Sequence, residues 1–277
     1  MQFTDQHNEI RRTVAQFVEK EINPHVEEWE EAGIFPAHEV FKKAGDLGLL
    51  GIHKPVEYGG LGLDYSYAMV ALEELGTASH GSVPLAISVQ TDMATPALAR
   101  FGSDQLKNEF LAPAIAGDMV AAIGVSEPHA GSDVAAIKTT AKKRGDDYVI
   151  SVTKMWITNS TQADFICLLA NTSDDHKHHN KSLIIVPTDT PGFSTSPRLN
   201  KLGMRSSDTA QLFLDDVVVP RRNLIGEEGK GFIYQMMQFQ EERLAGTAIC
   251  IKGLEYCIRK TIEYTSQREA FGKPLII

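Results

Sequence analysis

The 277-residue sequence has few cysteines, no long apolar run and fewer basic than acidic residues. Its three cysteines, Cys167, Cys250 and Cys257, are widely spaced and form no C-x-x-C motif, which excludes a disulfide framework and indicates a reducing compartment. No apolar run approaches the roughly 20 residues that a membrane-spanning helix needs. Twenty-seven Lys and Arg stand against 36 Asp and Glu, a net charge of −9, which disfavours binding to nucleic acid or to anionic lipid. We therefore expect a soluble protein that binds neither.

The N-terminus also lacks the features of a targeting segment. Residues 1–12 contain neither the basic nor the apolar region of a secretory signal, and the early Asp5 and Glu9 are atypical of a transit peptide. We therefore expect the protein to stay where it is made. The remaining composition, 43% hydrophobic and 23% charged, is typical of a folded protein with about two domains, or three.

The first part of the chain is predicted to be helical. An apolar stripe with helical spacing precedes Pro24, and Asp64 and Gly76 bound a further helix as its N-cap and its C-terminal stop. Other helices are expected at 41–49, 89–101 and 103–112. The pattern predicts an N-terminal α-helical domain over 1–117.

The character of the sequence changes near Gly117. Short segments rich in Val, Ile and Leu follow, separated by turn signals such as Gly145-Asp146-Asp147. We expect strands at 147–158, 165–170, 181–186 and 212–219. Because no helices alternate with them, they predict an antiparallel β-barrel or sandwich over 118–229.

One long helix is expected after Gly231. Its apolar residues step by three or four positions from Leu244 to Thr265, and such a stripe needs the partners of a helical bundle. Because the sequence stops shortly afterwards, residues 230–277 are expected to form only the start of a C-terminal bundle. The fold class is therefore α+β and multidomain, in the order α, β, α.

Two segments near the change from helix to strand are candidates for ligand binding. Residues 123–133 combine Gly, Ser and Pro, so that their N–H and hydroxyl groups could contact a flat ring or a phosphate, although an ordinary connecting loop has the same composition. At the end of a strand, Trp156 could stack on an aromatic ligand while Thr158 bonds its edge; the alternative is a core Trp.

Two segments of the long helix are further candidates. In the run 240–243, the carboxylate of Glu242 and the guanidinium of Arg243 point in different directions, so that one could act on a ligand, although a solvated charged face explains the same residues. Arg268 and Phe271 could together clamp a phosphate and stack on a base; a helix C-terminus with a basic residue and a Gly cap is the alternative.

A histidine-rich run at 173–181 raises the question of a metal site. His176, His178 and His179 follow Asp174 and Asp175, but the run lies between predicted strands. We interpret it as a solvated loop and predict no metal.

Taken together, the ordered segments EPHAGSD, KMWITN, KLGMRSSDT, DDVVVP, NLIGEEGKGF and REAFGKPL resemble the acyl-CoA dehydrogenase family. The earlier PVEYGGLGL and ARFGSDQLK resemble its N-terminal helical domain, so the likeness runs over essentially the whole chain. It implies a helical domain, a middle β-barrel, and a C-terminal four-helix bundle that is incomplete here.

The resemblance also implies FAD as the cofactor. It places the flavin against Ile123 to Ser132, with Val125 and Ser126 near the ring and Ser132 beside the acyl-CoA or the diphosphate. The matching residues are Ile123, Val125, Ser126, Gly131, Ser132, Trp156, Ile157 and Thr158, with Arg268 and Phe271 reaching the FAD of a neighbouring subunit.

The reaction that the resemblance implies is α,β-dehydrogenation of an acyl-CoA thioester. A carboxylate removes the α-proton while the β-hydrogen moves as hydride to the flavin, and the electrons pass to an electron-transfer flavoprotein. Glu242-Arg243-Leu244 resembles the E-R-L triplet of isovaleryl-CoA and long-chain acyl-CoA dehydrogenases, which makes Glu242 the expected base and Arg243 a substrate contact. Gln240 departs from the Asp that relatives often carry before this triplet.

Three expectations stay open at the level of sequence. The missing bundle helices favour, as one alternative, a truncated form that binds acyl-CoA or partner subunits without turnover; an oxygen-using acyl-CoA oxidase of the same fold is another. Relatives suggest a homotetramer. They also suggest the mitochondrial matrix for a mature eukaryotic form and the cytoplasm otherwise.

Overall fold

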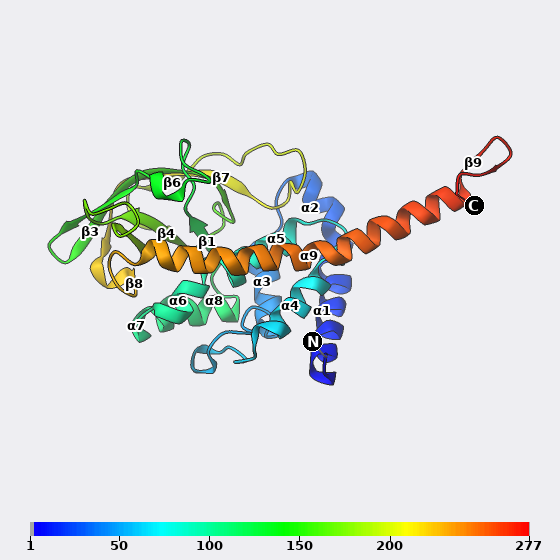
Figure 1. Ribbon diagram of the computed structural model, residues 1–277, viewed down its shortest axis with the longest axis horizontal. Helices are drawn as coiled ribbons and strands as arrows, with labels where there is room; N and C mark the ends of the chain where they lie inside the picture. Colours follow the sequence, from blue (N-terminus) through cyan, green and yellow to red (C-terminus); the bar gives the residue numbers. More distant parts are fainter. Residues whose placement is uncertain (1–2, 277) are drawn as a thin grey trace.

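The computed structural model describes residues 3–276, which form a helical layer, a twisted sheet and one very long helix (Figure 1). The N-terminal part is helical, as the sequence predicts. Its elements are α1 (Asp5–Phe17), η1 (Val18–Ile22), η2 (Asn23–His25), α2 (Val26–Ala32), α3 (Ala37–Asp46), η3 (Val56–Tyr58), α4 (Tyr65–Leu75), α5 (Ser82–Ser88), η4 (Val89–Ala94), α6 (Pro96–Phe101), α7 (Asp104–Leu106), η5 (Lys107–Leu111) and α8 (Ala112–Ala116).

Local signals in the sequence set several of these boundaries. Asp64 caps α4 by accepting a hydrogen bond from the Ser66 N–H at 2.8 Å, and Gly76 follows the last residue of that helix. Pro24 lies in the 3₁₀ turn η2, after the helical run that it was expected to end. The two predicted helices at 89–101 and 103–112 each contain a π-helical turn, η4 and η5.

The middle part is one eight-stranded sheet. Its strands are β1 (Ala121–Gly124), β2 (Thr140–Arg144), β3 (Asp147–Thr158), β4 (Phe165–Asn171), β5 (Lys181–Pro187), β6 (Phe193–Thr195), β7 (Thr209–Pro220) and β8 (Leu224–Ile225). The strand order is β6-β7-β3-β2-β4-β5-β8, with β1 paired to β4. All four predicted strands are present, and the shorter β1, β2, β6 and β8 were not predicted.

The prediction of an antiparallel barrel is wrong in two respects. Within residues 3–276 the sheet does not close, because β6 and β8 end the path, and β1 and β2 pair with β4 in parallel. The alternation of apolar and polar residues along a strand indicates which face of the strand is buried. It does not indicate which strands pair with each other at the edges of the sheet. Two register shifts between β3 and β7, one of them between Lys154 and Ile157, interrupt the longest pairing of the sheet.

The long helix α9 (Gly231–Gln267) crosses the molecule between the sheet and the N-terminal helices (Figure 1). Its first half is packed, and its buried residues end at Ala248. Beyond that point Leu254 and Ile258 are 63% and 60% exposed, and the helix extends away from the body of the molecule. This agrees with the expectation of a bundle helix whose apolar stripe lacks partners within the described residues.

A short hairpin of β9 (Glu269–Ala270) and β10 (Lys273–Pro274) follows α9. Phe271 and Gly272 form its turn, both with positive φ, at 56° and 76°. The alternative interpretation of this segment as a Gly-capped helix end is therefore wrong, because the helix ends at Gln267. No helix within residues 3–276 is long and apolar enough to cross a membrane.

Candidate active site

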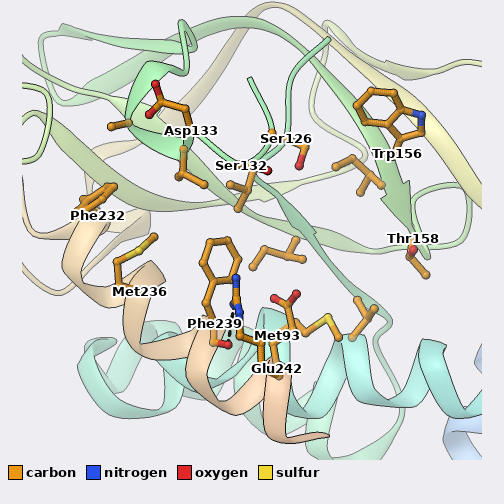
Figure 2. Close-up of a pocket in the computed structure, with 18 of the residues that line it drawn as sticks. Met93, Ser126, Ser132, Asp133, Trp156, Thr158, Phe232, Met236, Phe239 and Glu242 are labelled. Carbon is orange, nitrogen blue, oxygen red and sulfur yellow. Dashed lines mark hydrogen bonds between the residues drawn. The ribbon is translucent and has the colours of Figure 1, made fainter. Parts of the chain in front are cut away.

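A cavity of about 540 Å³ lies where the helical layer, the sheet and α9 meet. Its walls come from α5 and η4, from β1 and the loop that follows it, from the end of β3, and from the first half of α9 (Figure 2). Ten of the twelve residues predicted from the sequence line it: Ile123, Val125, Ser126, Gly131, Ser132, Trp156, Ile157, Thr158, Glu242 and Arg243. Segments separated by more than 100 positions are thus brought to one site.

The loop after β1 is held in shape by a buried carboxylate. Glu127 is 1% exposed and accepts hydrogen bonds from the Lys138 N–H at 2.7 Å and the Thr139 N–H at 2.9 Å. Burial acts to raise its pKa, but the charge of Lys154 and these hydrogen bonds hold the pKa of Glu127 below its usual range. Glu127 therefore folds the loop back on itself, leaving the small residues on either side of it at the cavity wall.

Lys154 is the partner of that carboxylate. It is fully buried in β3, and its Nζ donates to Glu127 Oε1 at 3.0 Å, to the Val125 carbonyl at 2.9 Å and to the Leu169 carbonyl at 3.1 Å. Burial lowers the pKa of Lys154 to about 8, against the opposing effect of Glu127. One buried side chain thus links the cavity loop to β3 and β4.

Trp156 adopts an unusual backbone conformation beside the cavity. Its φ is 59°, in the left-handed region that a bulky residue rarely occupies, and it lies at the register shift of β3 against β7. Its side chain is 56% exposed, so the alternative of a core Trp is wrong. Such strain at a cavity motivates a functional interpretation.

Three hydroxyl groups of the cavity wall are free of protein partners. Ser126, Ser132 and Thr158 make no side-chain hydrogen bond to any other residue in the described part of the chain. Ser126 is nevertheless fixed through its backbone, because its carbonyl accepts from the Met155 N–H at 3.0 Å. The cavity therefore combines an exposed indole, partnerless hydroxyls and apolar side chains, which suits a flat aromatic ligand with polar edges.

Glu242 enters this cavity from α9. Figure 2 shows its carboxylate pointing toward the space below the strand that carries Trp156 and Thr158. Burial raises the pKa of Glu242, while the neighbouring Arg243 acts to lower it. Arg243 donates to the Phe239 carbonyl at 2.8 Å, and its guanidinium carbon lies 5.1 Å from the centre of the Phe239 ring. The interpretation of this run as a solvated charged face is wrong for Glu242, which is half-buried.

Arg268 and Phe271 do not join the other predicted residues. They lie at and beyond the end of α9, away from the cavity, and the Phe271 side chain is fully exposed. The expectation that they reach a flavin in a neighbouring subunit stays a prediction.

Several cavity residues were not predicted from the sequence. Phe232, Met236 and Phe239 line the cavity at helical spacing on α9, and Val89 and Met93 do so from η4. Their signal was present as an apolar i, i+4, i+7 stripe, but that pattern cannot distinguish a cavity wall from an ordinary core.

The histidine-rich loop contributes one side chain to the site. His178 lines the cavity, with its ring centre 4.8 Å from that of Phe232. No group of three or more His, Cys, Asp or Glu within residues 3–276 is arranged to hold a metal ion.

Comparison with known protein families identifies the chain. Three family models match it in order: the acyl-CoA dehydrogenase N-terminal domain over residues 4–118, the middle domain over 122–217 and the C-terminal domain over 229–277. The fold is thus that of the acyl-CoA dehydrogenases. The chain belongs to the acyl-CoA dehydrogenase family, as its motifs predicted.

Individual relatives support the assignment. The chain is 36% identical over 273 residues to mouse mitochondrial long-chain specific acyl-CoA dehydrogenase, covering 98% of this chain and 63% of the relative. It matches the crystal structure of an acyl-CoA dehydrogenase from Geobacillus kaustophilus with a TM-score of 0.93 and 39% identity, covering 99% of this chain and 72% of the other. A Mycobacterium smegmatis glutaryl-CoA dehydrogenase in complex with FADH₂ matches with a TM-score of 0.89 and 34% identity, over 99% and 68% of the two chains.

Proposed function

We propose that the chain binds FAD in the 540 Å³ cavity and catalyses α,β-dehydrogenation of an acyl-CoA thioester to the trans-2-enoyl-CoA. The observation that carries the proposal is the convergence of the loop 125–135, the end of β3 and Glu242 on one cavity. Family membership supports the same chemistry. When bound, FAD supplies the hydride acceptor that removal of a β-hydrogen requires.

The residues of the cavity fit a flavin. The exposed indole of Trp156 offers a stacking surface, and Ser126 and Thr158 offer hydroxyls that no other group within residues 3–276 uses. Ile123, Val125 and Ile157 provide apolar contacts, and Gly131 adds no side chain beside them. Ser132, farther along the loop, is assigned to the acyl-CoA or to the diphosphate.

Glu242 is assigned as the base that accepts the α-proton. A carboxylate is an effective base near neutral pH only if its pKa is raised toward the working pH, and partial burial in an apolar wall has that effect here. Arg243 is assigned to the substrate, because its contact with the Phe239 ring holds a positive charge at the edge of the cavity.

The substrate class is proposed to be a branched or longer acyl-CoA. The support is the Glu242-Arg243-Leu244 triplet, which resembles that of isovaleryl-CoA and long-chain acyl-CoA dehydrogenases, and the long-chain mouse relative. Electrons are proposed to pass to an electron-transfer flavoprotein.

Product analysis tests the function directly. The purified chain is loaded with FAD and incubated with straight and branched acyl-CoAs and an artificial electron acceptor, and the thioesters are analysed by mass spectrometry. We expect a product lacking two hydrogens from at least one branched or longer substrate. Bound FAD with no such product from any member of the panel would contradict the proposal. Turnover that consumes oxygen without the acceptor would instead identify an oxidase.

A further inference from the structure

A buried polar stripe runs along α9 outside the lining of the cavity. Gln235, Gln238 and Glu241 recur every three residues and are 0%, 1% and 9% exposed. Gln238 Oε1 accepts from the Ala97 N–H at 3.0 Å, in the first turn of α6. Gln235 Oε1 accepts from Gln238 Nε2 at 3.3 Å within the helix, so it is Gln238 and Glu241 that pair with α6.

The last member of the stripe is a carboxylate that pairs with α6. Arg100 Nη2 donates to Glu241 Oε1, and the Glu241 side chain is 12% exposed against 41% for Arg100. The other carboxylate oxygen, Oε2, is buried and has no hydrogen-bond partner among residues 3–276. Arg100 is therefore the single direct ionic partner of Glu241 among the described residues.

Other charged groups surround this pair from each element packed against it. The Tyr65 hydroxyl, from α4, lies 3.3 Å from the Glu241 carbonyl and 3.0 Å from Asp92 Oδ1 in η4. Burial raises the pKa of Asp92 and lowers that of Lys54 to about 8. His53, whose pKa is lowered to about 2 chiefly by burial, also faces Arg100, and the cavity wall adds Asp133, His178 and Arg243.

The position of the pair next to Glu242 gives it a consequence for the cavity. Glu241 and Glu242 are adjacent carboxylates near the helix surface, one facing α6 and the other facing the cavity. A negative charge at the adjacent position disfavours the ionised form of Glu242, and Arg100 offsets that effect by supplying the opposite charge. The Arg100–Glu241 pair also joins α6 to the turn of α9 from which Glu242 projects.

We propose that Arg100 is a positioning residue. By pairing with Glu241 it holds that carboxylate against α6, so that Glu242 is the only one of the two adjacent carboxylates that acts as the base of the site. This inference rests on the function proposed above and deepens it. Arg100 and Glu241 lie outside the residues that line the cavity, so they act through Glu242 and not on the ligand.

A titration of Glu242 without flavin or substrate tests the proposal. The chain is labelled with ¹³C at the glutamate carboxyls, and the Glu242 resonance is assigned by its loss in Glu242→Gln. Arg100→Met leaves the negative charge of Glu241 uncompensated and should raise the pH at the titration midpoint of Glu242 by about half a unit. Glu241→Gln leaves the positive charge of Arg100 uncompensated and should lower the Glu242 midpoint. In the double variant the midpoint should return toward that of the parent.

Two controls separate this role from a structural one. Arg100→Lys keeps the positive charge and should leave the midpoint near that of the parent. Arg222→Met removes an arginine of similar exposure, 45% against 41% for Arg100, whose Nη1 lies 2.6 Å from Glu109 Oε2 outside the cavity lining, and it should not move the midpoint. Equal shifts, or none, in Arg100→Met and Glu241→Gln would overturn the proposal, because loss of packing alone does not act with opposite signs.

The same variants distinguish this inference from the proposed function. In the FAD-loaded protein, the pH dependence of flavin reduction by acyl-CoA should follow the shifts seen by NMR. If the two variants shift the Glu242 midpoint in opposite directions but the protein produces no enoyl-CoA, the positioning role of Arg100 is supported and the proposed function is contradicted. If the protein produces enoyl-CoA but the midpoint does not shift in opposite directions, the proposed function is supported and the positioning role is contradicted.

Discussion

The exposed indole of Trp156 is the clearest sign of function at the scale of single residues. A left-handed backbone at a large aromatic residue costs of the order of 1–3 kcal/mol, and more than half of the side chain gains nothing from burial. The residue is explained if the strained strand end holds the ring where a ligand can stack on it.

Trp156→Ala should weaken FAD binding about tenfold, because the stacking surface is lost. Stability should change by less than about 1 kcal/mol, since the ring is largely exposed. Fluorescence titration with FAD and chemical denaturation measure the two effects. Trp156→Phe keeps an aromatic face and should retain most of the affinity; equal FAD affinity in the alanine variant would exclude a stacking role.

Glu242 is the residue on which the proposed chemistry depends. Glu242→Gln keeps the shape of the side chain and removes its ability to accept a proton, so FAD should bind as in the parent while flavin reduction by acyl-CoA slows by about a thousandfold. Stopped-flow absorbance under anaerobic conditions measures the rate. In Glu242→Asp, which retains a carboxylate, flavin reduction should be faster than in Glu242→Gln. Flavin reduction at the parent rate in Glu242→Gln would show that Glu242 is not the base.

At the scale of elements, the loop after β1 depends on the buried pair of Glu127 and Lys154. Lys154→Met would leave Glu127 buried without its cation, and breaking a buried pair in this way costs about 3–5 kcal/mol. The free energy of unfolding should fall by that amount in urea denaturation. Adding Glu127→Gln should recover part of it; a double variant as unstable as the sum of the single variants would show that the two residues do not act as a pair.

The elements also show what the sequence could and could not predict. The strand β3 and the long helix α9 begin or end where their turn and glycine signals lie, because those signals are local. The sheet edges, the parallel pairs of β4 and the bulge at Trp156 depend on contacts between distant segments, which leave no local pattern. The same limit explains why Glu127 and Lys154 were read only as parts of motifs.

The candidate site was predicted through the order of its motifs and not through any single residue. Ser126, Trp156 and Glu242 each had a plausible structural alternative, and only their common family pattern placed them together. Arg100 had no signal at all, since an arginine at the end of a short helix is ordinary until its partner on α9 is known.

At the scale of the whole molecule, Glu30 connects the helical layer to the long loop before β7. It accepts hydrogen bonds from the Arg205 N–H at 2.8 Å, from Ser206, and from Ser82 in α5. Burial acts to raise its pKa, but the hydrogen bonds from Ser206 and Ser82 outweigh it and lower the pKa to about 2. One carboxylate thus joins α2, α5 and the loop at 202–208.

These hydrogen bonds predict that the free energy of unfolding depends on pH in the acid range. Because the folded pKa is lowered from 4.5 to about 2, the contribution of Glu30 is present above pH 4.5 and is lost as the pH falls toward 2. Its size is at most about 3 kcal/mol. Glu30→Gln should be less stable at pH 7 and should lose less stability between pH 4.5 and 2.5 in urea titrations. An unchanged slope in that window would show that Glu30 is not the group responsible.

The most direct test of the account is an anaerobic absorbance spectrum of the FAD-loaded chain before and after addition of acyl-CoAs. We expect a bound flavin whose visible absorbance bleaches with at least one branched or longer acyl-CoA in the parent chain and does not bleach in Glu242→Gln. A chain that remains colourless after loading with FAD, or whose flavin stays oxidised with every substrate, would contradict it.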